Sequence, residues 1–349
     1  MTCKEVIHLE TKYLTQQKVQ QAAQILKRGG LLGIPTETVY GLGANGLDPQ
    51  AVEDIFRAKG RPQDNPLILH IPDVGWLDRY CRNIPASAYD LASAFWPGPM
   101  TMILERKAVV PDVVTAGLDT VGMRCPDHAL CRKIIAAADV PVAAPSGNTS
   151  GRPSPTTAQH MMEDMDGKID AIMDGGPCTV GVESTIVDLT CTPPRLLRPG
   201  GVTLEQLRGV LGEVEVDPAV TRLMGAGERP RAPGMKYRHY APKAPVTVVA
   251  GDPKESAAYI AAHAAPEDGI ICFDEFEDRF TGQSVTRPVM VLGPSTDKEE
   301  QARHIFDALR HFDHTDVPAI WAQCPDASGI GLAIANRLNK AAGFHIIEV

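Results

Sequence analysis

The sequence predicts a mixed α/β protein in two parts, a large twisted sheet followed by a smaller α/β unit. Short apolar runs bounded by glycine and proline alternate with segments of helical periodicity along the chain of 349 residues, which is the pattern of buried strands and amphipathic helices. Several strands within residues 1–216 follow one another without a helix between them, so a regular doubly wound sheet is not expected there. Residues 246–349 alternate strand and helix, which predicts a small parallel, Rossmann-like sheet.

The elements of the first part are placed by their apolar runs and their end signals. Asp48 is a favoured N-cap, Pro49 suits a first helical turn and Gly60 suits the residue after a helix. Thr203 and Gln206 have the spacing of a capping box. The expected helices cover residues 19–26, 49–59, 86–95, 127–138, 156–165 and the segment after 203, and the expected strands cover 31–34, 67–71, 100–104, 121–124, 140–144, 169–173, 183–189 and 195–198.

A linker rich in glycine and proline separates the two parts, and we place it at residues 217–245. Within it, Met235 to Tyr240 interleaves aromatic and basic side chains, a composition suited to stacking on a base and pairing with phosphates. The linker is therefore predicted to close over the site as a lid, with Tyr237 against the nucleotide. The alternative is a spacer whose rings only dock the two domains.

Composition and charge narrow the class of protein. The chain is 44% hydrophobic and 22% charged, its first residues contain no apolar stretch, and no run reaches the eighteen apolar residues of a membrane span. We expect a cytoplasmic protein without a membrane contact. The net charge of −9 is concentrated in residues 246–349, which hold eight Lys and Arg against sixteen Asp and Glu, so a polyanion should meet the first part instead.

No protein metal site is predicted. The eight cysteines are scattered without the spacing of a zinc site. His311 and His314 lie beside Asp313 and Asp316, and we assign them to a solvated helix face.

Two segments could bind an anion. Lys59 and Arg61 flank a glycine at the end of a predicted helix, which suits a polyphosphate, although cations at a helix end also stabilise the helix dipole. The loop over residues 145–154 is rich in hydroxyls and glycine directly after a strand, where backbone N–H groups can form an anion nest; otherwise it is a solvent loop. The GxGxxG pattern at residues 41–46 is not read as a dinucleotide site, because the helix starts after its last glycine with a carboxylate.

Five motifs occur in one order: PTETVYGLG at residues 35–43, KGRPxxNPLILH at 59–70, APSGNxSG at 144–151, ESTIVD at 183–188 and LRPG at 197–200. In this order and spacing the chain resembles the YrdC-like L-threonylcarbamoyl-AMP synthases, in their longer two-domain form. The resemblance implies a twisted α/β sheet around a concave, positive cleft.

The resemblance also implies an activity, the ATP-dependent synthesis of threonylcarbamoyl-AMP from L-threonine and bicarbonate or CO₂, with release of pyrophosphate. Mg²⁺ would arrive with ATP, and a separate transferase would pass the product to tRNA adenosine beside the anticodon. By motif match the catalytic cations are Lys59 and Arg61. The ATP contacts would be Lys59, Arg61, Asn65, Thr120, Ser146, Asn148, Ser154 and Arg198, with Tyr237 from the linker, and the threonine contacts would be Thr38, His70, Arg124, Ala144 and Ser184.

A non-enzymatic alternative is a module that binds double-stranded RNA through the same basic cleft. Duplex RNA needs an extended basic face and its affinity falls steeply with salt, whereas a nucleotide needs one deep, saturable pocket. A satisfied polar core residue remains the alternative for Ser184 and His70.

Overall fold

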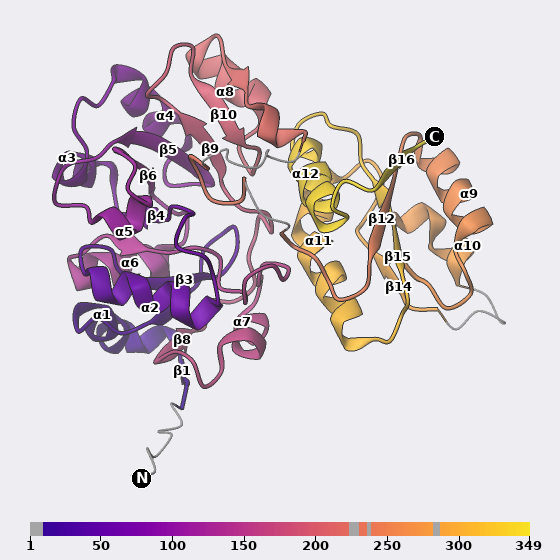
Figure 1. Ribbon diagram of the computed structural model, residues 1–349, viewed down its shortest axis with the longest axis horizontal. Helices are drawn as coiled ribbons and strands as arrows, with labels where there is room; N and C mark the ends of the chain where they lie inside the picture. The colour runs from indigo at the N-terminus through magenta and orange to yellow at the C-terminus, as the bar shows by residue number, and fades with distance from the viewer. Residues whose placement is uncertain (1–9, 223–229, 236–238, 282–286) are drawn as a thin grey trace.

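The computed structural model describes residues 10–222, 230–235, 239–281 and 287–349. These residues form two sheets, one of eleven strands and one of five. Figure 1 shows them as two lobes joined by the linker, with α11 and α12 on the side of the second lobe that faces the first. The mixed α/β fold predicted from the sequence is confirmed.

The first sheet has the strand order β1-β8-β2-β3-β7-β4-β6-β5-β9-β10-β11 and mixes parallel with antiparallel neighbours. Its strands are β1 (Lys12–Leu14), β2 (Leu32–Ile34), β3 (Gly41–Asn45), β4 (Ile68–His70), β5 (Met100–Glu105), β6 (Thr120–Arg124), β7 (Val142–Ala143), β8 (Ala171–Met173), β9 (Thr185–Asp188), β10 (Arg195–Arg198) and β11 (Glu215–Val216). Its helices are α1 (Val19–Lys27), α2 (Pro49–Lys59), α3 (Leu77–Tyr80), α4 (Ala86–Phe95), α5 (Asp112–Thr115), α6 (Ala129–Ala138), α7 (Ala158–Met165) and α8 (Leu204–Leu211).

The end signals read from the sequence act as expected. The Asp48 side chain accepts from the N–H groups of Gln50 and Ala51, and Gly60 takes the left-handed conformation that ends α2. Thr203 and Gln206 form the capping box of α8. Because α2 ends at Lys59, as expected, Lys59 and Arg61 lie together at the C-terminal end of this helix.

Several predicted boundaries differ from the structure by one or two residues, as for β8 and β9, and two of the differences have a clear local reason. The strand expected at residues 140–144 is paired only from Val142, since Pro141 has no N–H to give to a ladder. The helix expected from Asp127 begins at Ala129, and the ring of His128 caps it by accepting from the N–H of Cys131.

The glycine-rich segment after β2 is a strand, β3, which the sequence analysis did not predict. A Cβ on Gly43 would lie 2.9 Å from Cγ1 of Val142, and one on Gly46 would lie 2.5 Å from Cδ2 of Leu69. These glycines are required by close packing between neighbouring strands. That packing explains the GxGxxG pattern without a dinucleotide.

The second sheet is fully parallel, as predicted, in the order β14-β13-β15-β12-β16. Its strands are β12 (Val246–Ala250), β13 (Gly269–Cys272), β14 (Val289–Val291), β15 (Ile320–Cys324) and β16 (Ile346–Glu348), and its helices are α9 (Pro253–His263), α10 (Glu277–Phe280), α11 (Lys298–His311) and α12 (Gly331–Ala341). β16 was not expected. Val39 and Val182 of the first lobe join the apolar core of the second, so the two lobes share buried surface.

Among the described residues, no helix is both long and apolar enough to span a membrane.

Candidate active site

The ends of several strands of the first sheet meet at one cavity. β4 and β6 are parallel neighbours in the register that pairs His70 with Arg124, so both side chains lie at the same edge of the sheet. The cavity of about 60 Å³ is lined by Thr36, Val39, Gly41, Arg61, Ile68, His70, Arg124, Ala144, Pro145, Ser146, Asn148, Glu183, Ser184, Arg198, Pro233, Gly234, His239 and Tyr240.

Most of the predicted site residues lie in this wall or directly behind it. Arg61, His70, Arg124, Ala144, Ser146, Asn148, Ser184 and Arg198 line the cavity. Thr38, Lys59, Asn65 and Ser154 are buried behind it, each bonded to a lining residue. Thr120 is the exception, because it lies at the opposite end of β6 from Arg124 and pairs with Glu105. Tyr237 lies outside the described residues.

Lys59 supports the loop that carries Ser146 and Asn148. Its side chain is buried, and Nζ donates to the carbonyl oxygens of Ser146 and Asn148. Burial, together with the charge of Arg61, holds the pKa of Lys59 well below its usual range. In this arrangement Lys59 fixes the loop, and its ammonium group lies behind the loop without lining the cavity.

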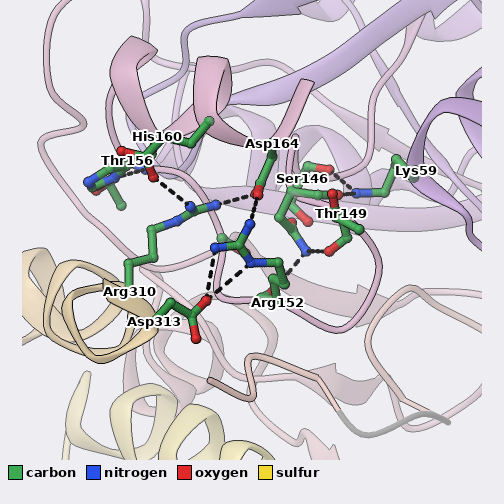
Figure 2. A network of polar contacts seen from close by, with 12 residues as sticks. Lys59, Ser146, Thr149, Arg152, Thr156, His160, Asp164, Arg310 and Asp313 are labelled. Atoms are coloured by element: carbon green, nitrogen blue, oxygen red, sulfur yellow. Dashed lines mark hydrogen bonds and ion pairs between the residues drawn. The ribbon is translucent and has the colours of Figure 1, made fainter. Parts of the chain in front are cut away.

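The same loop is tied to the second lobe through Arg152 (Figure 2). The carbonyl of Arg152 accepts from Nδ2 of Asn148 at 2.8 Å, while its guanidinium pairs with Asp164 of α7 and, at 2.9 Å, with Asp313. Arg310 of α11 reaches the same carboxylate of Asp164. The loop of residues 145–154 is therefore held by contacts from both lobes.

Arg198 is a buried cation of the cavity wall, and three of its nitrogens donate hydrogen bonds. Nε and Nη2 donate to the backbone carbonyl of Ser184 at 3.0 and 2.9 Å, Nη2 also donates to its Oγ at 3.1 Å, and Nη1 reaches the carbonyl of Pro233 at 3.4 Å. Burial lowers the pKa of Arg198 to about 10, so it remains a cation at neutral pH.

Arg124 and His70 form a second polar group at the strand ends. Arg124 Nη2 lies 2.8 Å from Oε2 of Glu37, an ion pair in which both side chains are buried but the alignment is not that of a hydrogen bond. Burial, and then the charge of Arg124, lowers the pKa of His70 to about 3. His70 is therefore neutral at pH 7, and among the described residues its Nδ1 has no hydrogen-bond partner.

Glu183 is a cavity residue that the sequence analysis missed, although it opens the ESTIVD motif. Oε1 accepts from Oγ of Ser154 at 2.6 Å and Oε2 accepts from Nε of Arg337 at 2.9 Å. Burial opposes ionisation of this carboxyl, but Arg337, Arg198 and Ser154 together hold its pKa below the usual value. Glu183 and Glu37 were both missed because a carboxylate is not an expected member of a phosphate-binding site.

The linker covers the cavity. Pro233, Gly234, His239 and Tyr240 form part of its wall. A cavity of about 60 Å³ holds only a few water molecules, whereas sites for cofactor-sized ligands occupy roughly 300 Å³ or more. Among the described residues, the linker therefore narrows the cavity to less than the space that a nucleotide needs.

The geometry agrees with the comparisons with known proteins. The family described as "Telomere recombination" (Sua5, YciO and YrdC) matches residues 24–200, and that described as "Threonylcarbamoyl-AMP synthase, C-terminal domain" matches residues 202–343. A threonylcarbamoyl-AMP synthase of Pyrococcus abyssi is 47% identical over 340 residues, which cover 96% of this chain and 97% of that protein. The chain belongs to the threonylcarbamoyl-AMP synthase family.

Other members of this family extend the likeness. The Bacillus subtilis threonylcarbamoyl-AMP synthase is 43% identical over 95% of this chain and 94% of its own. The crystal structure of P. abyssi Sua5 complexed with L-threonine superposes with a TM-score of 0.88 at 45% identity, covering 97% of this chain and 99% of that one. A doubly substituted variant of P. abyssi Sua5 gives a TM-score of 0.90 at 45% identity, over 97% and 98% of the two chains. The family and the two-domain architecture inferred from the motifs are confirmed.

Proposed function

We propose that this protein condenses L-threonine, bicarbonate or CO₂, and ATP into threonylcarbamoyl-AMP and releases pyrophosphate. The observation that carries the proposal is the closed cavity, in which Arg61, Arg124 and Arg198 converge beside hydroxyl groups and a neutral histidine. Such a set binds carboxylate and phosphate without supplying a nucleophile. The P. abyssi relative has been crystallised with L-threonine, which supports threonine as one substrate.

The reaction needs placement and charge dispersal more than acid–base chemistry. The neutral threonine amine adds to CO₂ and loses one proton to water, which gives a carbamate. A carbamate oxygen then attacks the α-phosphorus of ATP; the bond from that phosphorus to the bridging oxygen breaks, and pyrophosphate leaves. Arg124 would pair with the threonine carboxylate, with Thr38, His70, Ser184 and the backbone of Ala144 around it. Arg61 and Arg198 would disperse the charge that develops on the phosphates, which pre-placed guanidinium groups do without reorganisation.

The loop would hold the rest of the nucleotide. Lys59 would hold this loop in place by donating to the carbonyls of Ser146 and Asn148. Its ammonium would approach the phosphates if ATP displaced one of these two carbonyl oxygens. Asn65 and Ser154 lie close behind, and among the described residues both polar side-chain atoms of Asn65 are buried without a partner. We assign Thr120 no direct contact in this arrangement, because it lies at the far end of β6.

Mg²⁺ would enter as part of the nucleotide substrate, with phosphate oxygens and water as its ligands. No group of three or more His, Cys, Asp or Glu that could hold a metal occurs within the described part of the chain. We therefore assign the ion no protein ligand.

The product would serve a separate cytoplasmic transferase that modifies tRNA adenosine next to the anticodon. We do not propose the alternative of a double-stranded RNA module. That module would use the cleft of Lys59 and Arg61, but Lys59 is only 2% exposed and its ammonium donates to the carbonyls of Ser146 and Asn148, so it is not part of the extended basic face that duplex RNA needs.

The test is to incubate the purified protein with ATP, threonine and labelled bicarbonate. We expect pyrophosphate and a labile labelled adenylate to form together, and only when all three substrates are present. Pyrophosphate release that does not depend on threonine or bicarbonate would overturn the proposal. Saturable binding of duplex RNA that is lost with rising salt, without adenylate formation, would favour the RNA module.

A further inference from the structure

The last helix of the second lobe presents three buried polar side chains to the first lobe. Asn336, Arg337 and Lys340 of α12 are all at most 5% exposed. Asn336 Nδ2 donates to the carbonyl of Val220 at 2.7 Å, and Lys340 Nζ donates to the carbonyl of Gly234 in the linker. α12 therefore contacts the linker at its start and at the cavity wall.

Arg337 lies between these two contacts and reaches Glu183, a residue of the cavity wall. It is fully buried, its Nε donates to Oε2 of Glu183 at 2.9 Å, and its Nη1 donates to the carbonyl of Pro199 at 2.6 Å. Its guanidinium also lies 5.8 Å from the ring centre of Tyr240. One side chain of the second lobe thus touches the acidic wall residue, the segment after Arg198 and the covering linker.

Glu183 transmits this contact to the nucleotide site. Its other oxygen accepts a hydrogen bond from Ser154. Burial, and then the charge of Glu183, raises the pKa of the Tyr240 hydroxyl to about 12. We propose that Arg337 is a positioning residue: it fixes the Glu183 carboxylate so that Ser154 and Tyr240 are set for ATP, and the second lobe thereby completes the site. This inference rests on the proposed function.

A purely structural role explains this pair less well. A buried ion pair is often no more stabilising than an apolar pair of the same volume, so stability alone gives little reason to place one at a cavity wall. An unneutralised carboxylate there would repel phosphate, and a protonated one would be a weaker acceptor for the Ser154 hydroxyl. Arg106 provides the contrast, because its guanidinium donates to the carbonyls of Leu118 and Val110 and pairs with Asp112, and none of these residues lines the cavity.

The first test compares Arg337→Gln with Arg337→Lys and with the control Arg106→Gln. We expect Arg337→Gln to raise KM for ATP or lower kcat by between about tenfold and 10²-fold, since small misplacements in a site have effects of that size. Arg337→Lys keeps the positive charge but cannot contact Glu183 and the carbonyl of Pro199 at the same time. Its KM for ATP and kcat should therefore lie between those of Arg337→Gln and the natural protein. Arg106→Gln should change thermal stability with little effect on KM for ATP, because none of the partners of Arg106 lines the cavity.

A second readout does not depend on turnover. The groups that face Glu183 are Arg198, Arg337, Lys340, His239, Tyr240 and the Ser154 hydroxyl. Removing Arg337 should move the titration of the Glu183 carboxyl to higher pH, by about one to three units. Carbon-13 NMR of the glutamate carboxyl groups measures this, with Glu183→Gln identifying the signal. An unshifted titration in folded Arg337→Gln would overturn the proposal.

A double variant keeps the test decisive if Arg337→Gln fails to fold. Arg337→Met/Glu183→Gln removes both charges, so it should recover most of the stability lost by either single variant. A positioning role predicts that KM for ATP or kcat stays impaired. Recovery of turnover together with stability would show that the pair is only structural. If the natural protein made no adenylate, the proposed function would fail, whereas the carboxyl titration would still report on the pair.

Discussion

The cavity has two walls of different origin. One is built from strand ends of the first sheet and carries Arg124, Ser184 and Arg198, which the backbone register and several hydrogen bonds hold in place. The other is the covering wall of residues 233–234 and 239–240, which side chains of α12 hold from behind. The fixed wall contains the cations suited to the proposed chemistry, and we propose that the covering wall controls access to them.

The largest effect is expected from the cations that face the phosphates. Arg198→Ala and Arg61→Ala should each reduce turnover by about 10² or more, because each removes a charge-assisted contact to a transferring phosphate. Pyrophosphate release measures turnover. Circular dichroism checks the fold, since Arg198→Ala also leaves the buried carbonyl of Ser184 without its donors.

Arg57→Ala is the matched control for these two variants. Arg57 is an exposed arginine of α2 that pairs with Asp54 one turn away and does not line the cavity. Its loss should leave turnover nearly unchanged. Near-normal adenylate formation in both Arg61→Ala and Arg198→Ala would remove these residues from the phosphate role.

Opening of the covering wall is the next effect in size. The side chain of Arg231 pairs with Asp188 at 2.6 Å in the closed arrangement, so trypsin should cut there only when the linker opens. We expect saturating ATP and threonine to protect Arg231 in the full chain. Lys236 and Arg238, where we expect the same protection, lie outside the described residues.

Shortening the chain tests the same wall from the other side. A chain that ends before Gly225 should stay folded yet turn over poorly, because water then reaches a carbamate and a mixed anhydride that both decompose in it. Equal cleavage with and without substrates, together with unchanged turnover after truncation, would leave the linker as a spacer that docks the two lobes.

Threonine binding should separate two cations of the first lobe. Arg124→Ala should weaken binding by about 1.5–3 kcal/mol, the range for a hydrogen bond to a charged group, whereas Lys59→Met should have a smaller effect because Lys59 contacts backbone carbonyls. Serine should bind less well than threonine by about 1 kcal/mol or more for the missing methyl group. Isothermal calorimetry measures all three.

The partner of Arg124 needs its own control. Arg124→Ala leaves Glu37 buried and unpaired, so the double variant Arg124→Ala/Glu37→Gln separates lost recognition from an uncompensated charge. Threonine affinity equal to that of the natural protein in both variants would mean that the carboxylate is bound elsewhere.

The fixed wall was largely predictable from the sequence, and the covering wall only in part. Motifs that follow strands place His70, Arg124, Ser146 and Arg198 because strand ends are set locally and meet at one sheet edge. The glycines of β3 were not recognised as a strand, since their reason is the neighbouring strand at Val142. Arg337 was invisible for the same kind of reason: its partner is 154 positions away and no periodicity links them.

The last prediction compares one histidine from each wall. Burial lowers the pKa of both His70 and His239 to about 3, so neither should titrate between pH 5 and 8 while the cavity is closed. His70 is held by the sheet and should stay neutral throughout that range. His239 belongs to the covering wall, and opening would return its pKa toward the usual 6.5.

The sign of the pH effect follows from proton binding. The closed arrangement binds fewer protons than the open one between pH 3 and 6.5, because the pKa of His239 is lowered on closing; acid therefore favours opening, by up to about 2 kcal/mol at pH 5. NMR of the histidine Cε1 protons should show a titration for His239 at an apparent pKa above 3 without substrates and none with saturating ATP and threonine, whereas His70 should not titrate in either state. If both rings titrated together near 6.5 without substrates, the cavity would not be closed in solution; if neither titrated down to pH 4, the covering wall would be as fixed as the sheet, and access would require another route.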